Sequence, residues 1–87
     1  MLKILRSSNG QVIFTLIGRM QAERVAELEE LLKSEAGTRQ IVLDLKDLTL
    51  VDRDAVRFFD RCEKSGIKLG NCPAYVREWI TRERGGS

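Results

Sequence analysis

The sequence has no histidine, one proline and two cysteines. Without histidine, the chain lacks the commonest general base, the serine–histidine and cysteine–histidine nucleophile systems and the usual zinc ligand. Its two cysteines, Cys62 and Cys72, are expected to be reduced and packed rather than bridged. These absences predict a protein that is not an enzyme and that carries no metal and no cofactor.

The sequence also has no apolar run long enough to cross a bilayer. Residues 1–6 are too few and too charged to be the apolar core of a signal peptide. Gly66 and Gly70 are too widely spaced for a phosphate-binding loop. A net charge of only +2 gives no strong case for binding nucleic acid. We therefore predict a cytoplasmic protein with no membrane insertion and no nucleic-acid partner.

The length of 87 residues suits one domain and not two. We predict a single domain over residues 1–84 and a flexible C-terminal tail over residues 85–87. Charge is spread unevenly, because acids dominate residues 21–36 and bases dominate from Arg53 onward. These segments are either two solvated helix faces or two faces that meet different partners.

The first part of the sequence predicts two strands. Residues 2–6 form the first, and Asn9 with Gly10 is a strong turn signal because both residues tolerate positive φ. Residues 11–17 form the second, which Gly18 is expected to end. Both of its faces are apolar, which predicts an interior strand covered on both sides. The faces consist of Val12, Phe14 and Leu16 against Ile13 and Ile17.

A helix and a third strand follow. Apolar residues adopt the helical period over residues 21–36, and Gly37 is a suitable stop. Residues 40–46 then form an apolar strand. Strand, helix and strand with short joints make a βαβ unit, so these two strands are predicted to be parallel with a right-handed crossover.

The C-terminal half predicts two more helices around a short strand. Asp52 or Asp54 can cap the first of them, and residues 65–66 end it. Residues 67–69 form a very short strand, and Pro73 begins the last helix. Spacing predicts the buried side chains of the two helices: Ala55, Phe58, Phe59 and Cys62 in the first, and Val76, Trp79 and Ile80 in the second.

The predicted order is therefore β-β-α-β-α-β-α. This is an α/β domain with a mixed sheet of about four strands, only one pair of them antiparallel, and helices packed on it.

Four segments in this order resemble STAS domains, the fold of the anti-anti-sigma factors. They are Leu-Ile-Gly-Arg-Met at 16–20, Ile-Val-Leu-Asp-Leu at 41–45, Leu-Thr-Leu-Val-Asp at 48–52 and Cys-Pro-Ala-Tyr-Val-Arg at 72–77. The resemblance implies a small STAS-like domain that binds proteins. Bacterial members act in partner switching: they bind a kinase-like anti-sigma factor or another regulator, and phosphorylation of a serine at the start of the second helix breaks the complex.

The sequence departs from the family at that serine. The family pattern Asp-Ser-Ser-Gly is replaced by Asp52-Arg53-Asp54-Ala55, so the usual phosphorylation cannot occur. Asp54 either imitates the phosphorylated state or is simply a favourable residue in the first turn of a helix whose switch has been lost. Thr49 is the nearest hydroxyl, either a substitute acceptor or a structural strand residue.

Two further charge patterns allow alternatives. Asp44, Asp47, Asp52 and Asp54 could together bind a cation, but a turn and a helix cap explain them with fewer assumptions. The stripe of bases on the second helix is either a solvated face or a contact for an acidic partner, and it consists of Arg53, Arg57, Arg61 and Lys64.

The sequence and the resemblance together predict a non-catalytic regulatory module with a protein partner. The partner is a kinase-like anti-sigma factor or another regulator, and homodimerisation is possible. The alternative is an accessory STAS subunit of an ABC-type lipid transporter, whose partners are transporter subunits. We predict that the partner contacts the start of the second helix and the segment before it, through Asp52, Arg53, Asp54, Arg57 and Thr49.

Overall fold

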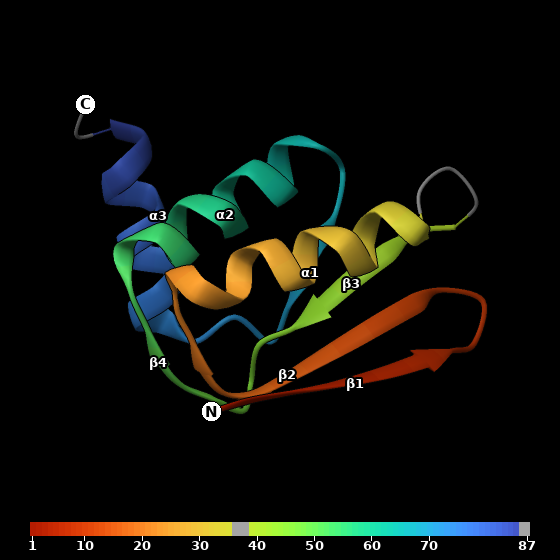
Figure 1. The fold of residues 1–87 in the computed structure, drawn as a ribbon. Helices are drawn as coiled ribbons and strands as arrows, with labels where there is room; N and C mark the ends of the chain where they lie inside the picture. The colour runs from red at the N-terminus through yellow and green to blue at the C-terminus, as the bar shows by residue number, and fades with distance from the viewer. Residues whose placement is uncertain (36–38, 86–87) are drawn as a thin grey trace.

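The computed structural model describes residues 1–35 and 39–85. Within these residues the chain forms five strands and three helices in the order β-β-α-β-β-α-β-α (Figure 1). The predicted α/β class with a mixed sheet is confirmed. The elements are β1 (Leu2–Ser8), β2 (Val12–Met20), α1 (Ala22–Ser34), β3 (Ile41–Asp44), β4 (Leu48–Val51), α2 (Arg53–Lys64), β5 (Lys68–Gly70) and α3 (Ala74–Gly85).

Strand β4 is the element missing from the predicted order. Its two end residues, Leu48 and Val51, are buried, and the two between them are exposed. A four-residue strand with this pattern shows no alternation of apolar and polar residues, so the usual sequence signal is absent. The strand forms because β2 extends far enough to pair with it in parallel.

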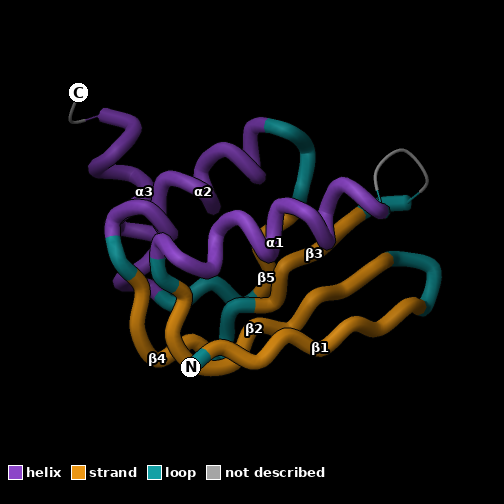
Figure 2. The backbone as a smooth tube through the Cα atoms, viewed as in Figure 1, coloured by secondary structure: helices purple, strands orange, loops and turns teal. Residues whose placement is uncertain are grey.

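The sheet runs in the order β1-β2-β3-β5, and β4 pairs with β2 beyond the end of β3 (Figure 2). The hairpin of β1 and β2 is antiparallel and the other pairs are parallel, as predicted. Strand β3 ends at Asp44 rather than at residue 46, because a turn follows in which the Leu48 amide donates to the Leu45 carbonyl. This turn moves the chain from the β3 pairing to the β4 pairing.

The predicted end of the second strand at Gly18 is wrong, because β2 continues to Met20. Gly18 has a φ of +105°, and the pairing with β4 shifts register between Gly18 and Arg19. The Arg19 amide donates to the Met1 carbonyl at 3.1 Å. Glycine therefore forms a bulge here instead of stopping the strand.

Replacing Gly18 with alanine is expected to destabilise the protein by about 2–4 kcal/mol. Its Cβ would clash with the Met1 carbonyl oxygen, in addition to the cost of about 1–3 kcal/mol for a residue other than glycine at positive φ. Gly10 is the matched control, because its φ is +81° and a Cβ there would meet nothing within 4 Å. Urea unfolding of both variants measures the difference. Equal destabilisation would contradict the close contact at Gly18.

All three helices lie on one side of the β1–β2 hairpin (Figure 1). The predicted covering of β2 on both faces is therefore wrong, and Ile13 and Ile17 remain partly exposed whereas Phe14 and Leu16 are buried. The reason is topological. The crossovers from β2 to β3 and from β4 to β5 advance in the same direction along the sheet, so right-handed connections place both helices on one face.

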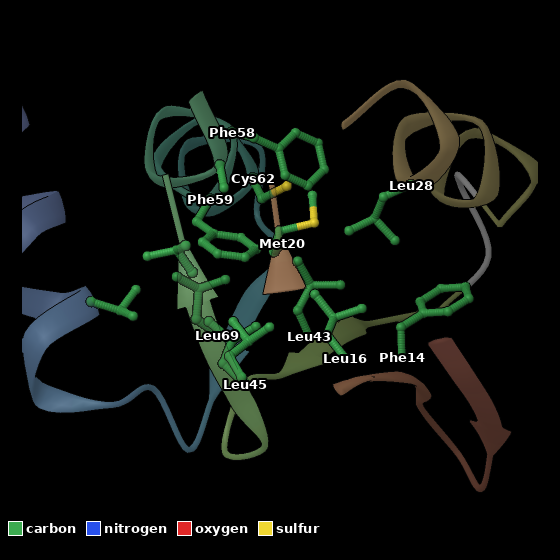
Figure 3. Packing of buried hydrophobic residues seen from close by; sticks show 14 of the residues in the cluster. Phe14, Leu16, Met20, Leu28, Leu43, Leu45, Phe58, Phe59, Cys62 and Leu69 are labelled. Atoms are coloured by element: carbon green, nitrogen blue, oxygen red, sulfur yellow. The ribbon is translucent and has the colours of Figure 1, made fainter. Parts of the chain in front are cut away.

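The core fills the space between that face and helices α1 and α2. Figure 3 shows Phe14, Leu16 and Leu43 pointing from the sheet towards the helices. Phe58, Phe59 and Cys62 of α2 are buried as predicted, as is Ala55. Full burial of a large apolar side chain contributes about 1.5–3 kcal/mol, so this layer holds the helices on the sheet.

Helix ends differ slightly from the predictions. Helix α1 spans Ala22–Ser34, and its predicted stop at Gly37 lies outside the described residues. Helix α3 includes Gly85, which was assigned to the tail, and residues 86–87 lie outside the described residues. Pro73 precedes α3, and its carbonyl accepts from the amides of Val76 and Arg77. Ile80 is buried as predicted, like Val76, while Trp79 is only partly buried.

Candidate partner-binding site

The candidate site is the segment where β4 ends and α2 begins. Asp52 is the N-cap of α2, with extended backbone (φ −112°, ψ −179°), and its Oδ1 accepts from the Ala55 amide at 2.9 Å. Of the two predicted caps, Asp52 is therefore the one that acts. Asp54 lies in the first turn of the helix, where a negative charge is favoured by the helix dipole.

Asp52 also caps a second helix. Its Oδ2 accepts from the amide of Ala22, the first residue of α1, at 2.9 Å. The N-cap residue of α1, Gln21, makes no side-chain capping bond of its own. One carboxylate therefore joins the starts of α1 and α2, and this makes Asp52 a residue that positions the site. Its direct contact with a partner stays a prediction.

Replacing Asp52 with alanine is expected to lower the free energy of unfolding by about 2–3 kcal/mol. The loss of a single cap costs about 0.5–2 kcal/mol, and this carboxylate caps two helices. Asp54→Ala is the matched control, because it removes a first-turn charge worth about 0.3–1 kcal/mol. Denaturant unfolding monitored by circular dichroism measures both variants. An equal loss in the two would contradict the double cap.

Arg53 and Arg57 are exposed on the first two turns of α2, with side-chain exposures of 64% and 53%. The Nε of each donates to Oε1 of Glu83 on α3, at 3.4 Å and 3.3 Å respectively. Burial opposes ionisation of Glu83, but the hydrogen bonds and charges of Arg57 and Arg53 outweigh it and lower its pKa. No sequence pattern points to Glu83, because it lies 26 residues or more from the two arginines along the chain.

A small hollow adjoins Arg57 between the N-terminal halves of α1 and α2. Its volume is about 250 Å³, and it is lined by Ala22, Val25, Asp54, Arg57 and Arg61. The hollow therefore combines an apolar wall from α1 with charged groups from α2. Of the residues predicted to contact a partner, Asp54 and Arg57 both line this hollow.

The other predicted contact, Thr49, is exposed on β4. Leu50 beside it is also exposed, at 44%, and the sequence analysis did not single it out. The only sequence pattern that would indicate Leu50 is the presence of an apolar residue close to the start of a helix. Thr49 and Leu50 shortly precede Arg53, Asp54 and Arg57 along the chain, and all five residues are exposed.

The basic stripe on α2 is exposed and paired within the chain. Besides Arg53 and Arg57, Arg61 lies 3.6 Å from a carboxylate oxygen of Glu29 on α1 and 5.9 Å from the Phe58 ring centroid. Lys64 lies 3.3 Å from Asp60. The stripe is therefore neither a bare positive surface nor a set of purely solvated charges.

A second ionic cluster joins α3 to α2. Both terminal nitrogens of Arg77 donate to Glu63, each at 2.9 Å, and Arg84 contacts both Asp60 and Glu63. The hydrogen bond from Arg77 is the main cause of the lowered pKa of Glu63, and the bond from Arg84 is the main cause of the lowered pKa of Asp60. These contacts hold the helix that carries Glu83 against α2.

Acidification is expected to weaken this attachment. A carboxylate whose pKa is lower in the folded protein adds stability above its unfolded value, and that stability is lost as pH falls through the folded value. The loss should therefore begin near the ordinary values of 4.5 for Glu63 and 3.8 for Asp60. Glu63→Gln should lower the free energy of unfolding by about 1 kcal/mol at pH 7 and by progressively less below pH 4. Thermal melts against pH measure this, with Glu30→Gln as control; a cost independent of pH would contradict it.

The described residues offer little catalytic chemistry. Cys62 is buried and its thiol pKa is raised to about 12, chiefly by desolvation, so it is a poor nucleophile at neutral pH. Asp44 accepts from the Lys46 amide and from Asn71, as a turn residue does. Among residues 1–35 and 39–85, no group of three or more acidic or cysteine side chains is placed to hold a metal ion.

In the part of the chain that the structure describes, no helix has the length and apolar character needed to span a membrane.

No family model matches the sequence, and no curated protein matches it. Solved structures do match. The anti-sigma factor antagonist SpoIIAA in its unphosphorylated form is 16% identical, with a TM-score of 0.65 over 94% of this chain and 83% of that one. An uncharacterised Shewanella loihica protein with a SpoIIAA-like fold is 18% identical, with a TM-score of 0.59 over 98% of this chain and 77% of that one.

The protein Mglu is also 18% identical, with a TM-score of 0.60 over 85% of this chain and 19% of that one. Likeness at these identities concerns the fold. The chain therefore has the small α/β fold of SpoIIAA, which confirms the predicted STAS-like architecture.

Proposed function

We propose that this chain is a non-catalytic regulatory module of the anti-sigma factor antagonist kind, which works in the cytoplasm by binding a protein partner. The observation that carries the proposal is the exposed start of α2, with Arg53 and Arg57 on its surface, in the fold of an anti-sigma factor antagonist. The partner is a kinase-like anti-sigma factor or a similar regulator, and the module takes part in partner switching.

The binding surface runs from β4 onto the first two turns of α2. Thr49 and Leu50 supply a short exposed strand with an apolar side chain, and Arg53, Asp54 and Arg57 supply charge. Asp52 holds the two helix starts in place behind this surface. Protein interfaces commonly combine apolar side chains with charged neighbours at their rim.

Serine phosphorylation at the start of α2 does not regulate this module, since positions 53 and 54 hold arginine and aspartate. Asp54 is exposed in the first turn, where its charge favours the helix in every state of the protein. Thr49 is exposed and remains the one nearby hydroxyl that a kinase would reach.

Reversing both charges, Arg53→Glu with Arg57→Glu, is expected to weaken partner capture about thirtyfold, the effect of removing two interface contacts worth about 1 kcal/mol each. The fold should survive, because exposed ion pairs contribute only about 0–1 kcal/mol each. Capture of the tagged full chain from an extract of its own cells, with mass spectrometry, measures the loss. Thermal melts check folding, and Lys68→Glu with Arg82→Glu is the control for charge reversal elsewhere.

The identity of the captured protein separates the two candidate functions. A kinase-like regulator lost in the Arg53 and Arg57 variant supports partner switching. Transporter subunits would instead show an accessory STAS subunit of an ABC-type lipid transporter. If the Arg53 and Arg57 variant and its control variant capture the same regulator at the same level, this surface is not the binding surface.

A further inference from the structure

We propose that Arg53 and Arg57 form a clamp for one acidic group of the partner, and that Glu83 of α3 occupies this clamp in the free protein. The inference rests on the proposed function, because it names the chemistry that the partner presents at that surface. The incoming group is a carboxylate or phosphoryl group on an acidic protein segment, and it binds by displacing Glu83.

The geometry of the two arginines carries the inference. They are four residues apart on α2, so they lie one above the other on the same helix face. The Nε of Arg57 lies 3.3 Å from Oε1 of Glu83, and the Nε of Arg53 lies 3.4 Å from both Oε1 and Oε2. Two guanidinium groups that converge on one carboxylate group make a site for an anion, and Glu83 shows which kind of group it holds.

The clamp is only loosely filled. The two contacts to Glu83 are 3.4 Å and 3.3 Å long, whereas the Arg77–Glu63 pair has two bonds of 2.9 Å in the parallel arrangement typical of strong pairs. Among the described residues, the terminal nitrogens of Arg53 and Arg57 donate no hydrogen bond. The clamp therefore has donors to spare, and a better-placed anion can form bonds that Glu83 does not.

The surroundings indicate how the partner segment is arranged. The hollow between α1 and α2 begins at Arg57 and has Val25 on its wall, so it suits a small apolar side chain next to the acidic one. Asp54 also lines the hollow and would repel a second acidic group there. The fitting segment therefore carries one acidic group for the clamp with an apolar neighbour.

Displacement of Glu83 need not detach α3. Arg77 and Arg84 still bind Asp60 and Glu63, and Ile80 remains in the core. The exchange is therefore local: one side chain of α3 leaves the arginines while the helix stays in place.

The test uses Glu83→Gln, which removes the competing charge. Inorganic phosphate is the probe, titrated into the isotope-labelled full chain at constant ionic strength with chloride as the reference anion. Arginine Nε–H signals in NMR spectra report binding at Arg53 and Arg57. Glu83→Gln is expected to bind phosphate about threefold more tightly than the native chain, a factor in the range of one exposed ion pair. Glu78→Gln, an exposed acid of the same helix, is the matched control.

Equal phosphate affinity in the Glu83→Gln and Glu78→Gln variants would overturn the inference. So would phosphate-dependent changes in the Nε–H signals of other arginines but not of Arg53 and Arg57. Partner capture separates this failure from failure of the proposed function. If the Arg53 and Arg57 charge reversal weakens capture but Glu83→Gln does not strengthen it, the binding surface stands and the clamp does not. Stronger capture by Glu83→Gln supports both.

Discussion

Pairing of β2 with three other strands is the interaction on which the rest of the structure depends. Strand β2 hydrogen-bonds to β1 on one side and to β3 and then β4 on the other. The bulge at Gly18 lets it continue long enough to serve β4, and β4 in turn delivers Asp52 to the start of α2. The position of the candidate site is thus determined by a glycine in the middle of a strand.

The candidate site combines residues that hold it with residues left free to bind. Both carboxylate oxygens of Asp52 accept from backbone amides, one at the start of α1 and one at the start of α2, and so hold the two helix starts together. Arg53 and Arg57 lie exposed on α2, and among the described residues their side chains hydrogen-bond only to Glu83. A fixed cap and exchangeable surface charges therefore lie within the first two turns of the same helix.

The fold was predictable from local patterns, and the errors arose where tertiary structure decides. Helical spacing identified the buried face of α2 with Phe58 and Phe59, because a helix on a core repeats its apolar residues regularly. Strand β4 was not predicted, because four residues are too few to show a period. Burial of Ile13 and Ile17 was predicted wrongly, because the apolar content of a strand does not show which face the helices cover. At the site, the capping role of Asp52 was predictable. The contact of Asp52 with Ala22 and the contact of Arg53 with Glu83 were not, because Ala22 and Glu83 belong to other helices.

The order of strand pairing also bears on how the chain acquires its structure during synthesis. Strand β2 pairs with β1, β3 and β4 pair with β2, and β5 pairs with β3. Every strand after the first thus finds its partner among segments that have already been made. A nascent chain that emerges from its N-terminus can therefore add each strand after β1 to a strand that has already been made.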